Sequence, residues 1–261
     1  MTVATLLEKA YGSFSIKSFE AMLLSLCEGL RVKVRVHGTS SRGWVQIEVC
    51  GEDEAVALRL LDREVGLAPA SAEGIGRFSV LRGKVVDPAK SKTELLVDVG
   101  LPVSGASGSF IPLWRLQAQL GDGKKVPLQR LIELFCLFDF VPVSVRIVSD
   151  LSCEKGAYEA EFSEVQLSRF SNWLDSNLDR VIVLGASRKD VEWAIERTHH
   201  LRDVFEIETL GLLEHALLCK LGTDAVGLLP KLGPYLAASS LAPFSPRKIR
   251  QLTGDSGPGR T

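Results

Sequence analysis

The chain has 261 residues, of which 46% are hydrophobic and 24% charged, and its formal net charge is -1. These values are typical of a globular protein with two or three domains, and they disfavour long disorder or the coating of nucleic acid by bulk charge. The chain shows neither a basic leader before an apolar run nor the roughly 18 continuous apolar residues of a membrane span. We therefore expect a cytoplasmic protein without a membrane partner.

The cysteines are scattered, and no two of them form a Cys-x-x-Cys pair. An odd number without clustering is typical of reduced thiols and disfavours a disulfide framework or a zinc site. The sequence predicts no metal and no cofactor. The five cysteines are Cys27, Cys50, Cys136, Cys153 and Cys219.

Residues 1–70 are predicted to form a small α+β module. The segment "VATLLEKAY" fits a strand or a short helix, whereas residues 16–30 carry apolar residues three or four apart, which predicts a helix. Two alternating segments, "LRVKVRVHG" and "WVQIEVC", flank a turn and predict a hairpin. A second helix is expected from "GEDEAVALRLLDREVG", with acidic residues at its start and Gly66 at its end.

The first hairpin strand places cations on one face and valines on the other, because successive side chains of a strand point to opposite faces. We expect the cations to lie beside Trp44, Gln46 and Glu48 of the second strand. Cations beside an indole suit a nucleic-acid surface, but a row of like charges also keeps an edge strand solvated. Both interpretations stay open at this point. The cationic row consists of Arg31, Lys33, Arg35 and His37.

Residues 71–150 begin with a linker rich in Ala, Gly and Ser and then change character. The segments "RFSVLRGKVVD", "TELLVDVG", "GSFIPL" and "VPVSVRIVSD" are short strands separated by turns, and "PLQRLIELFCLF" is a helix before the last of them. Short strands with Gly and Pro turns favour a small barrel. We expect a closed or nearly closed barrel whose inward residues include Val85, Val97, Val99, Ile111, Val143, Val145 and Ile147.

This middle segment resembles the RNA-binding OB-fold repeat of ribosomal protein S-one. The resemblance covers about 75 of the 261 residues and rests mainly on glycines at barrel bends and on inward aliphatic residues. It implies an OB-type barrel, with RNA as the ligand. The family's exposed aromatic and histidine cluster is only partly present, because the segment has no histidine. The matching residues are Gly83, Val85, Val97, Asp98, Gly100, Gly108 or Ser109, Phe110, Ile111, Pro112, Leu116, Val143, Val145 and Ile147.

The charge of the segment also favours RNA. Between Arg77 and Arg146 there are ten Lys and Arg against six Asp and Glu, which gives a local charge of about +4. Proteins that bind single strands combine a basic groove with aromatic faces on which bases stack. We expect phosphate contacts from Arg82, Lys84 and Arg115 and stacking by Trp114 or Phe78. Alternatively, the two aromatic residues fill the barrel core, as we expect for Phe110.

Residues 151–236 are predicted to form an α/β module, although a ferredoxin-like sheet would also fit. The order of elements is strand "YEAEFS", helix "EVQLSRFSNWLDSN", strand "RVIVLG", helix "SRKDVEWAIERTHH", strand "DVFEIETL" and helix "GLLEHALLCKL". We expect strands 181–185 and 204–209 to share one sheet, with helix 188–200 crossing between them. Residues 237–261 are rich in Ser, Pro and Gly and are expected to be a flexible tail.

The signals for an enzyme are weak. "LGASRKD" lies between a strand and a helix like a phosphate-binding turn, but it lacks the glycine spacing of known phosphate loops, and Ser187 is more simply a helix N-cap. His215 and Cys219 are four residues apart and could share a metal on a helix, but the sequence offers no third ligand. A buried helix face explains them better.

The sequence therefore predicts a three-part α+β protein: a small α+β module, an OB-type barrel and an α/β module. The expected function is non-catalytic binding of RNA in translation or RNA processing, and we expect this RNA to be single-stranded. A protein partner in a ribonucleoprotein is also considered, and no preference for DNA can be inferred. The alternatives are a protein–protein scaffold that uses the barrel, or an enzyme with its site in the C-terminal module. The order of elements also resembles a family of uncharacterised archaeal proteins.

Overall fold

The computed structural model describes residues 1–11, 15–101, 108–152 and 156–254, so Cys153 and the end of the predicted tail lie outside the described residues. The fold is α+β, as expected, and contains a closed barrel in the middle of the chain. The chain divides into two compact units. The first comprises Met1–Ala72 with residues 99–101, and the second comprises Glu73–Asp98 with the described residues from 108 onward.

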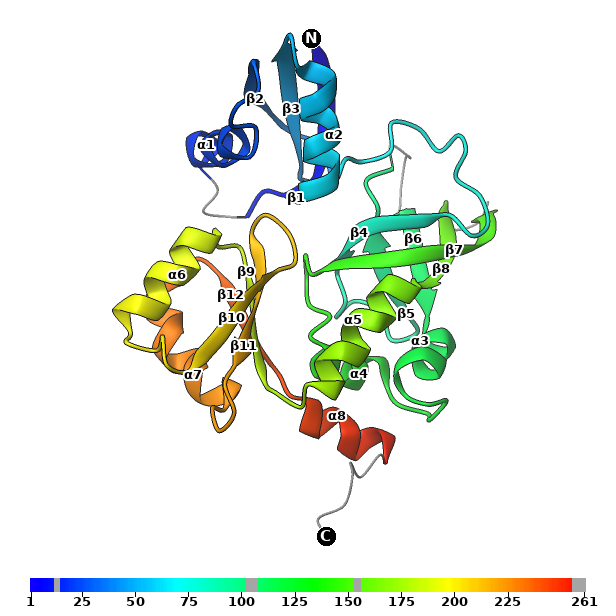
Figure 1. Ribbon diagram of the computed structural model, residues 1–261. Helices are drawn as coiled ribbons and strands as arrows, with labels where there is room; N and C mark the ends of the chain where they lie inside the picture. Colours follow the sequence, from blue (N-terminus) through cyan, green and yellow to red (C-terminus); the bar gives the residue numbers. More distant parts are fainter. Residues whose placement is uncertain (12–14, 102–107, 153–155, 255–261) are drawn as a thin grey trace. The chain divides into compact units, whose positions relative to one another are not determined.

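The first unit is a three-stranded antiparallel sheet with two helices (Figure 1). Its elements are β1 (Thr2–Lys9), α1 (Ile16–Leu26), β2 (Val32–Thr39), β3 (Trp44–Gly51) and α2 (Glu54–Glu64). The strand order is β1-β3-β2, so the segment that fitted either a strand or a helix is a strand. α1 packs against β2 and α2 against β3, and the two helices contact each other, so they cover one face of the sheet.

The second unit begins with the barrel. Its strands are β4 (Val80–Val86), β5 (Glu94–Asp98), β6 (Gly108–Pro112), β7 (Pro142–Ser152) and β8 (Ala157–Phe162), and α3 (Leu113–Leu120) and α4 (Leu128–Phe135) connect β6 to β7. The closed order is β4-β5-β6-β8-β7, with β6 and β8 parallel and all other pairs antiparallel. This strand order is compatible with a five-stranded Greek-key barrel of the OB type.

The interior of the barrel matches the prediction with one exception. Six of the expected inward residues are buried and lie in barrel strands. Val99 is also buried, but it follows the end of β5 and belongs to the first unit. This segment requires a glycine at position 100. The φ of Gly100 is +75°, and an added Cβ would lie 2.6 Å from the Cβ of Ala68.

The assignment of β8 to the C-terminal module was wrong. β8 pairs with β6 and β7 and closes the barrel. The sequence identified "YEAEF" as a strand, but a strand's own pattern does not specify its partners, and the expected boundary near residue 150 separated it from β7. β7 and β8 form the last antiparallel pair of the barrel, so the barrel ends at Phe162.

The C-terminal part is a four-stranded sheet with helices. Its elements are α5 (Glu164–Asp175), β9 (Arg180–Leu184), α6 (Arg188–Arg197), β10 (Val204–Thr209), β11 (Glu214–Cys219), α7 (Ala225–Leu232), η1 (Gly233–Tyr235), β12 (Ser240–Phe244) and α8 (Pro246–Thr253). The strand order is β10-β11-β9-β12. β9 and β10 therefore share one sheet, as predicted, and they run parallel because each is antiparallel to β11.

Two predictions for this part were wrong. "GLLEHALLCKL" was expected to be a helix, but it contains β11, a central strand that is nearly buried throughout. A short apolar run buried on both faces cannot be distinguished from a helix by periodicity. The expected flexible tail is also ordered as far as residue 254, because Ser240–Phe244 pairs with β9 and α8 contacts α4 and α5.

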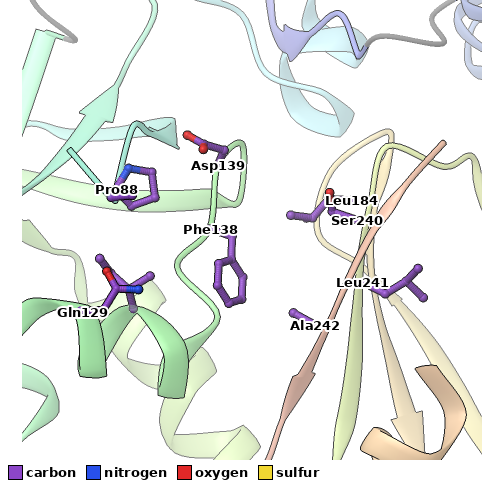
Figure 2. A pocket seen from close by; sticks show the side chains of 10 residues that line it. Pro88, Gln129, Phe138, Asp139, Leu184, Ser240, Leu241 and Ala242 are labelled. Atoms are coloured by element: carbon purple, nitrogen blue, oxygen red, sulfur yellow. The ribbon is translucent and has the colours of Figure 1, made fainter. Parts of the chain in front are cut away.

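A cavity of about 330 Å³ lies between the α4 side of the barrel and the edge strand β12 (Figure 2). The ring of Phe138 projects into it, and Leu184 and Ala242 contribute to the opposite wall. Asp139 is at its margin, where the carboxylate accepts a hydrogen bond of 2.6 Å from the backbone N–H of Asp87. The carboxylate of Asp139 therefore holds the turn that follows β4.

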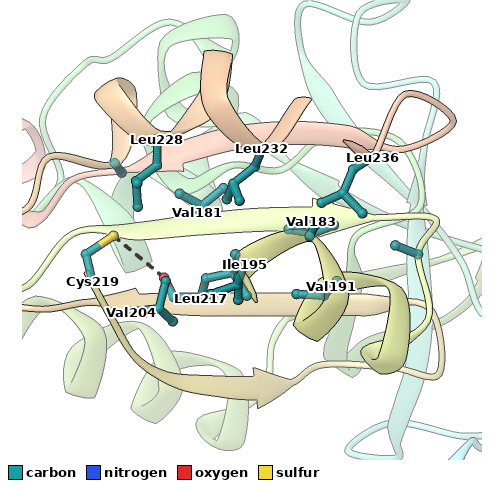
Figure 3. Close-up of a cluster of buried hydrophobic side chains, with 13 residues drawn as sticks. Val181, Val183, Val191, Ile195, Val204, Leu217, Cys219, Leu228, Leu232 and Leu236 are labelled. Carbon is teal, nitrogen blue, oxygen red and sulfur yellow. Dashed lines mark hydrogen bonds between the residues drawn. The ribbon is translucent and has the colours of Figure 1, made fainter. Parts of the chain in front are cut away.

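The other face of the sheet packs against α6 and α7 (Figure 3). The cluster joins β9 and β11 through Val181, Val183, Leu217 and Cys219, and Figure 3 shows these side chains beside those of both helices. Burial raises the pKa of the Cys219 thiol to about 11.

None of the helices in the described parts of the chain has the length and apolar character that a membrane span requires.

Candidate nucleic-acid interface

Phe78 is an exposed aromatic residue just before β4. Its side chain is 64% exposed, and the guanidinium of Arg77 lies 5.1 Å from the ring centroid. The backbone N–H of Phe78 donates to the carbonyl of Ile147 at 2.7 Å, which fixes the segment against β7. Its φ is +75°, a conformation that is unfavourable for a bulky residue and that costs about 1–3 kcal/mol. Phe78 therefore does not fill the barrel core.

Trp114 is the second exposed aromatic residue, in the first turn of α3. It is 59% exposed, and the guanidinium of Arg115 lies 4.3 Å from its ring centroid. Arg115 is held from β8: its Nε donates to Glu159 at 2.8 Å and its Nη1 to Glu161 at 3.1 Å. The expected pair of a cation and a stacking residue is present, but the cation already has two carboxylate partners.

Arg146 of β7 links the surroundings of Phe78 to those of Trp114. Its Nε donates to Glu161 at 2.9 Å, so Arg115 and Arg146 share one carboxylate. In the sheet, Arg146 lies opposite Val80 of β4, two residues after Phe78. We call Phe78, Val80, Arg146, Arg115 and Trp114 the aromatic–arginine face of the barrel. Arg82 is exposed on the next outward position of β4, opposite Ser144.

Lys84 is not on this surface. Its Nζ lies 2.7 Å from Glu214 Oε1 of β11, and both side chains are buried. A buried lysine with a carboxylate partner cannot reach a phosphate in solution. The sequence predicted Lys84 as a phosphate contact, but it did not predict that a strand of the C-terminal sheet would bury this side chain. Phe110 is buried, as expected.

The local charge of the barrel is also lower than the sequence suggested. The count of about +4 ended at Arg146 and left out β8. From Arg77 to Phe162 there are eleven Lys and Arg against ten Asp and Glu, which leaves a charge of +1. The sequence pattern did not identify three residues at the aromatic–arginine face, namely Glu159, Glu161 and Arg146. The alternation in "YEAEF" is the signal that places both glutamates on one face of β8.

The cationic row of the first unit is exposed, but the aromatic residue that was expected beside it is buried. Lys33 and Arg35 are exposed on β2, as predicted, and Arg31 is exposed immediately before it. Trp44, expected beside them, is buried, and the Nζ of Lys9 lies 3.9 Å from its ring centroid. Arg31 also forms an ion pair of 2.6 Å with Glu52. β2 is an edge strand, so the exposed charges are explained by protection of the edge.

The residues considered for an enzyme have structural roles. Ser187 is the N-cap of α6: its Oγ accepts from the backbone N–H of Asp190, and the Asp190 side chain accepts from the backbone N–H of Ser187. Neither residue lines the cavity of Figure 2. His215 and Cys219 lie on a strand, where four residues span about 13 Å, so they cannot share a metal ion. Burial lowers the pKa of His215.

Comparison with known proteins gives a match in one part of the chain. Residues 178–242 match the family model described as the DUF2110 C-terminal domain. These residues comprise β9, α6, β10, β11, α7, η1 and the first part of β12, and they leave out the barrel. No curated protein matches the chain. The match supports a relationship of the C-terminal sheet to a conserved family, and its description states no activity.

Proposed function

We propose that the protein binds single-stranded RNA through the aromatic–arginine face of its barrel and acts, without catalysis, in translation or RNA processing. One observation carries the proposal: Phe78 and Trp114 are both largely exposed, and each has an arginine at its ring. Exposed aromatic residues beside cations are what stacking of unpaired bases requires. The OB-type barrel adds support, because this fold commonly binds oligonucleotides.

The conformation of Phe78 supports the same proposal. A bulky residue at positive φ is unfavourable, and an exposed ring gains little from burial. Stability of the fold alone therefore does not account for a phenylalanine at this position. A ligand that stacks on the ring would account for it.

The paired charges determine what kind of RNA binding to expect. Because Glu159 and Glu161 already neutralise Arg115 and Arg146, these two arginines contribute little to phosphate binding. Each phosphate contact with a single strand contributes about -0.7 to the slope of log K against log salt. We expect a slope between about -1 and -2, with Arg77 and Arg82 as the phosphate contacts and most of the affinity from stacking.

The test is a fluorescence-anisotropy titration of labelled single-stranded RNA at several salt concentrations. Trp114→Ala and Phe78→Ala should each weaken binding by about 1–3 kcal/mol, with little dependence on sequence. Trp193→Ala is the matched control, because Trp193 is exposed on α6. A parallel titration with DNA of the same sequence shows whether the sugar matters. Absence of saturable binding at low salt, or an equal loss in the Trp193 control, would contradict the proposal.

The near-neutral barrel favours a second function, a scaffold for a protein partner. Val80, Phe78 and Trp114 are exposed apolar side chains on one face, and the neighbouring ion pairs resemble the polar rim of a protein interface. If this function is correct, the chain fails to bind RNA, and Trp114→Ala removes a protein that copurifies with the wild type after ribonuclease treatment. Trp193→Ala retains that protein.

A further inference from the structure

Arg180, the first residue of β9, is a buried arginine beneath α5. Its side chain is almost fully enclosed, with 5% of the residue exposed. One nitrogen, Nη1, donates to the carbonyl of Trp173 at 3.2 Å, to Ser176 Oγ at 3.0 Å and to the carbonyl of Leu178 at 3.1 Å. These acceptors lie at the C-terminal end of α5, where a cation is favoured by the helix dipole.

The guanidinium also lies over the ring of Trp173, with its central carbon 5.1 Å from the ring centroid. Within the described ranges, no hydrogen-bond acceptor contacts Arg180 Nε, and no carboxylate forms an ion pair with the side chain. Burial lowers the pKa of Arg180, and Glu208 and Glu206 oppose this shift only at longer range. Buried charges in proteins are normally paired, because removing a charge from water is unfavourable. The charge of Arg180 therefore lacks a directly bound counter-ion.

Arg180 is also one of the residues that line an open cleft of about 680 Å³ between α5 and the sheet. One face of α5 lines the cleft, because Asn172 follows Ser168 by four residues and Arg169 by three. The side chains of Ser168 and Asn172 are exposed. A hydroxyl and a carboxamide can each donate a hydrogen bond, and two arginines supply positive charge, so the cleft provides donors suited to an oxyanion.

The two carboxylates of the cleft are already engaged or directed elsewhere. Glu208 accepts a hydrogen bond of 2.8 Å from Trp173 Nε1 and lies 3.9 Å from Arg169 Nε. Glu164 has an 89% exposed side chain and lies 3.9 Å from Arg146, on the barrel side. Neither carboxylate forms an ion pair with Arg180, so Glu208 attracts that guanidinium only at longer range.

We propose that this cleft is an oxyanion site, in which Arg180 supplies the counter-charge and Ser168 and Asn172 donate hydrogen bonds to a small phosphate- or carboxylate-bearing ligand. Both groups have the oxygen geometry that a guanidinium binds. The site is separate from the aromatic–arginine face, so it does not depend on the proposed RNA binding. It adds a ligand to the part of the chain that includes the DUF2110 C-terminal match.

Calorimetric titration and thermal unfolding of the full chain test the site, with inorganic phosphate in one arm and acetate in the other. Both arms are run at constant ionic strength against chloride. We expect saturable binding and a Tm that rises with ligand concentration in at least one arm. The arm that responds identifies the ligand group. Equal behaviour in phosphate, acetate and chloride would overturn the proposal.

Two isosteric variants locate the ligand without disturbing the core. Asn172→Asp adds a negative charge inside the cleft and should weaken binding by about tenfold or more. Asn177→Asp is the matched control outside it, at an exposed position of φ 52° that aspartate tolerates. This control should retain wild-type affinity. Equal affinities of the two variants would show that the anion binds elsewhere and would overturn the assignment.

Arg180→Lys tests the guanidinium itself, because lysine keeps the charge and loses the forked donors. We expect weaker binding of phosphate or acetate than in the wild type, and unchanged affinity would remove Arg180 from the site. Trp114→Ala should leave the oxyanion affinity unchanged. This result separates the site from RNA binding, which the same variant weakens.

Discussion

Lys84 Nζ lies 2.7 Å from Glu214 Oε1, although 130 residues separate the two in the chain. Lys84 belongs to β4 of the barrel and Glu214 to β11 of the C-terminal sheet, and both side chains are buried. The ion pair therefore joins the two parts of the second unit. A residue that the local positive charge had suggested as a phosphate contact instead connects the barrel to the C-terminal sheet.

Removal of one partner of this pair should destabilise the protein strongly. Lys84→Met leaves the Glu214 carboxylate buried without its cation, and we expect the free energy of unfolding to fall by about 3–5 kcal/mol. Equilibrium urea unfolding measures the change. The double variant Lys84→Met/Glu214→Leu should recover much of the loss, because it removes both members of this ion pair together. The control Lys90→Met breaks an exposed ion pair of 2.7 Å with Asp87 and should change stability by less than about 1 kcal/mol.

Phe78→Gly should separate stability from binding. Glycine adopts a φ of +75° without strain, so we expect the free energy of unfolding to rise by up to about 1 kcal/mol despite the greater entropy of the unfolded chain. RNA affinity should fall in the same variant. Leu221→Gly, at an exposed position outside the positive-φ set, should lose about 0.5–1 kcal/mol. A comparable loss in both variants would show that Phe78 is not strained.

The capping box of α6 predicts a purely structural effect. Ser187→Ala removes the Oγ that accepts from the Asp190 backbone N–H, and it should cost about 0.5–2 kcal/mol in thermal or urea unfolding. Ser187→Asn should retain most of the stability, because asparagine is an equally good N-cap. If the alanine variant keeps full stability but loses a measurable activity, Ser187 has a chemical role and the enzyme alternative returns.

His215 should make the protein less stable in acid. Burial is the main cause that lowers its pKa below 6.5, opposed by Glu214 and by the bond of its Nε2 with the Ala186 carbonyl, while Arg188 lowers the pKa further. Below about pH 6.5 the unfolded chain takes up a proton that the folded chain resists, so stability present at pH 7 is lost as the pH falls through the folded pKa.

Urea unfolding between pH 7 and 5 measures this dependence, whose slope can reach about 1.4 kcal/mol per pH unit for one histidine. His215→Gln should reduce the slope, whereas His37→Gln, at an exposed position, should leave it unchanged. A slope that persists in His215→Gln would assign the acid sensitivity to another group.

Local sequence patterns predicted those elements that have one buried face and one solvated face along their whole length. The alternation in β2 and β3 identified a hairpin, because one face is buried under helices and the other is solvated. The same reasoning failed for β11, which is buried on both faces and shows no period that distinguishes it from a helix. It also failed for β12, which lies among Ser and Pro residues and is held by pairing with β9.

The candidate site was predicted in composition but not in arrangement. Phe78, Trp114 and Arg115 were named from the sequence, and all three lie on the aromatic–arginine face. Their exposure became known only from the fold, because an aromatic residue next to a barrel strand fits the core as well as the surface. The pairing of Arg115 and Arg146 with Glu161 depends on the return of β8 to the barrel.

The sequence by itself determined the α+β class, the hairpin of the first unit, the inward residues of the barrel and the N-cap of α6, because these follow from side chains within a few positions of one another. The tertiary structure decided that β8 closes the barrel, that Lys84 is buried against Glu214 and that Arg180 lies beneath α5. Each of these depends on pairing or packing between distant segments. A residue's own neighbours in the chain carry little information about which strand or helix will cover it, and that cover decides whether a charge reaches a ligand or holds the fold together.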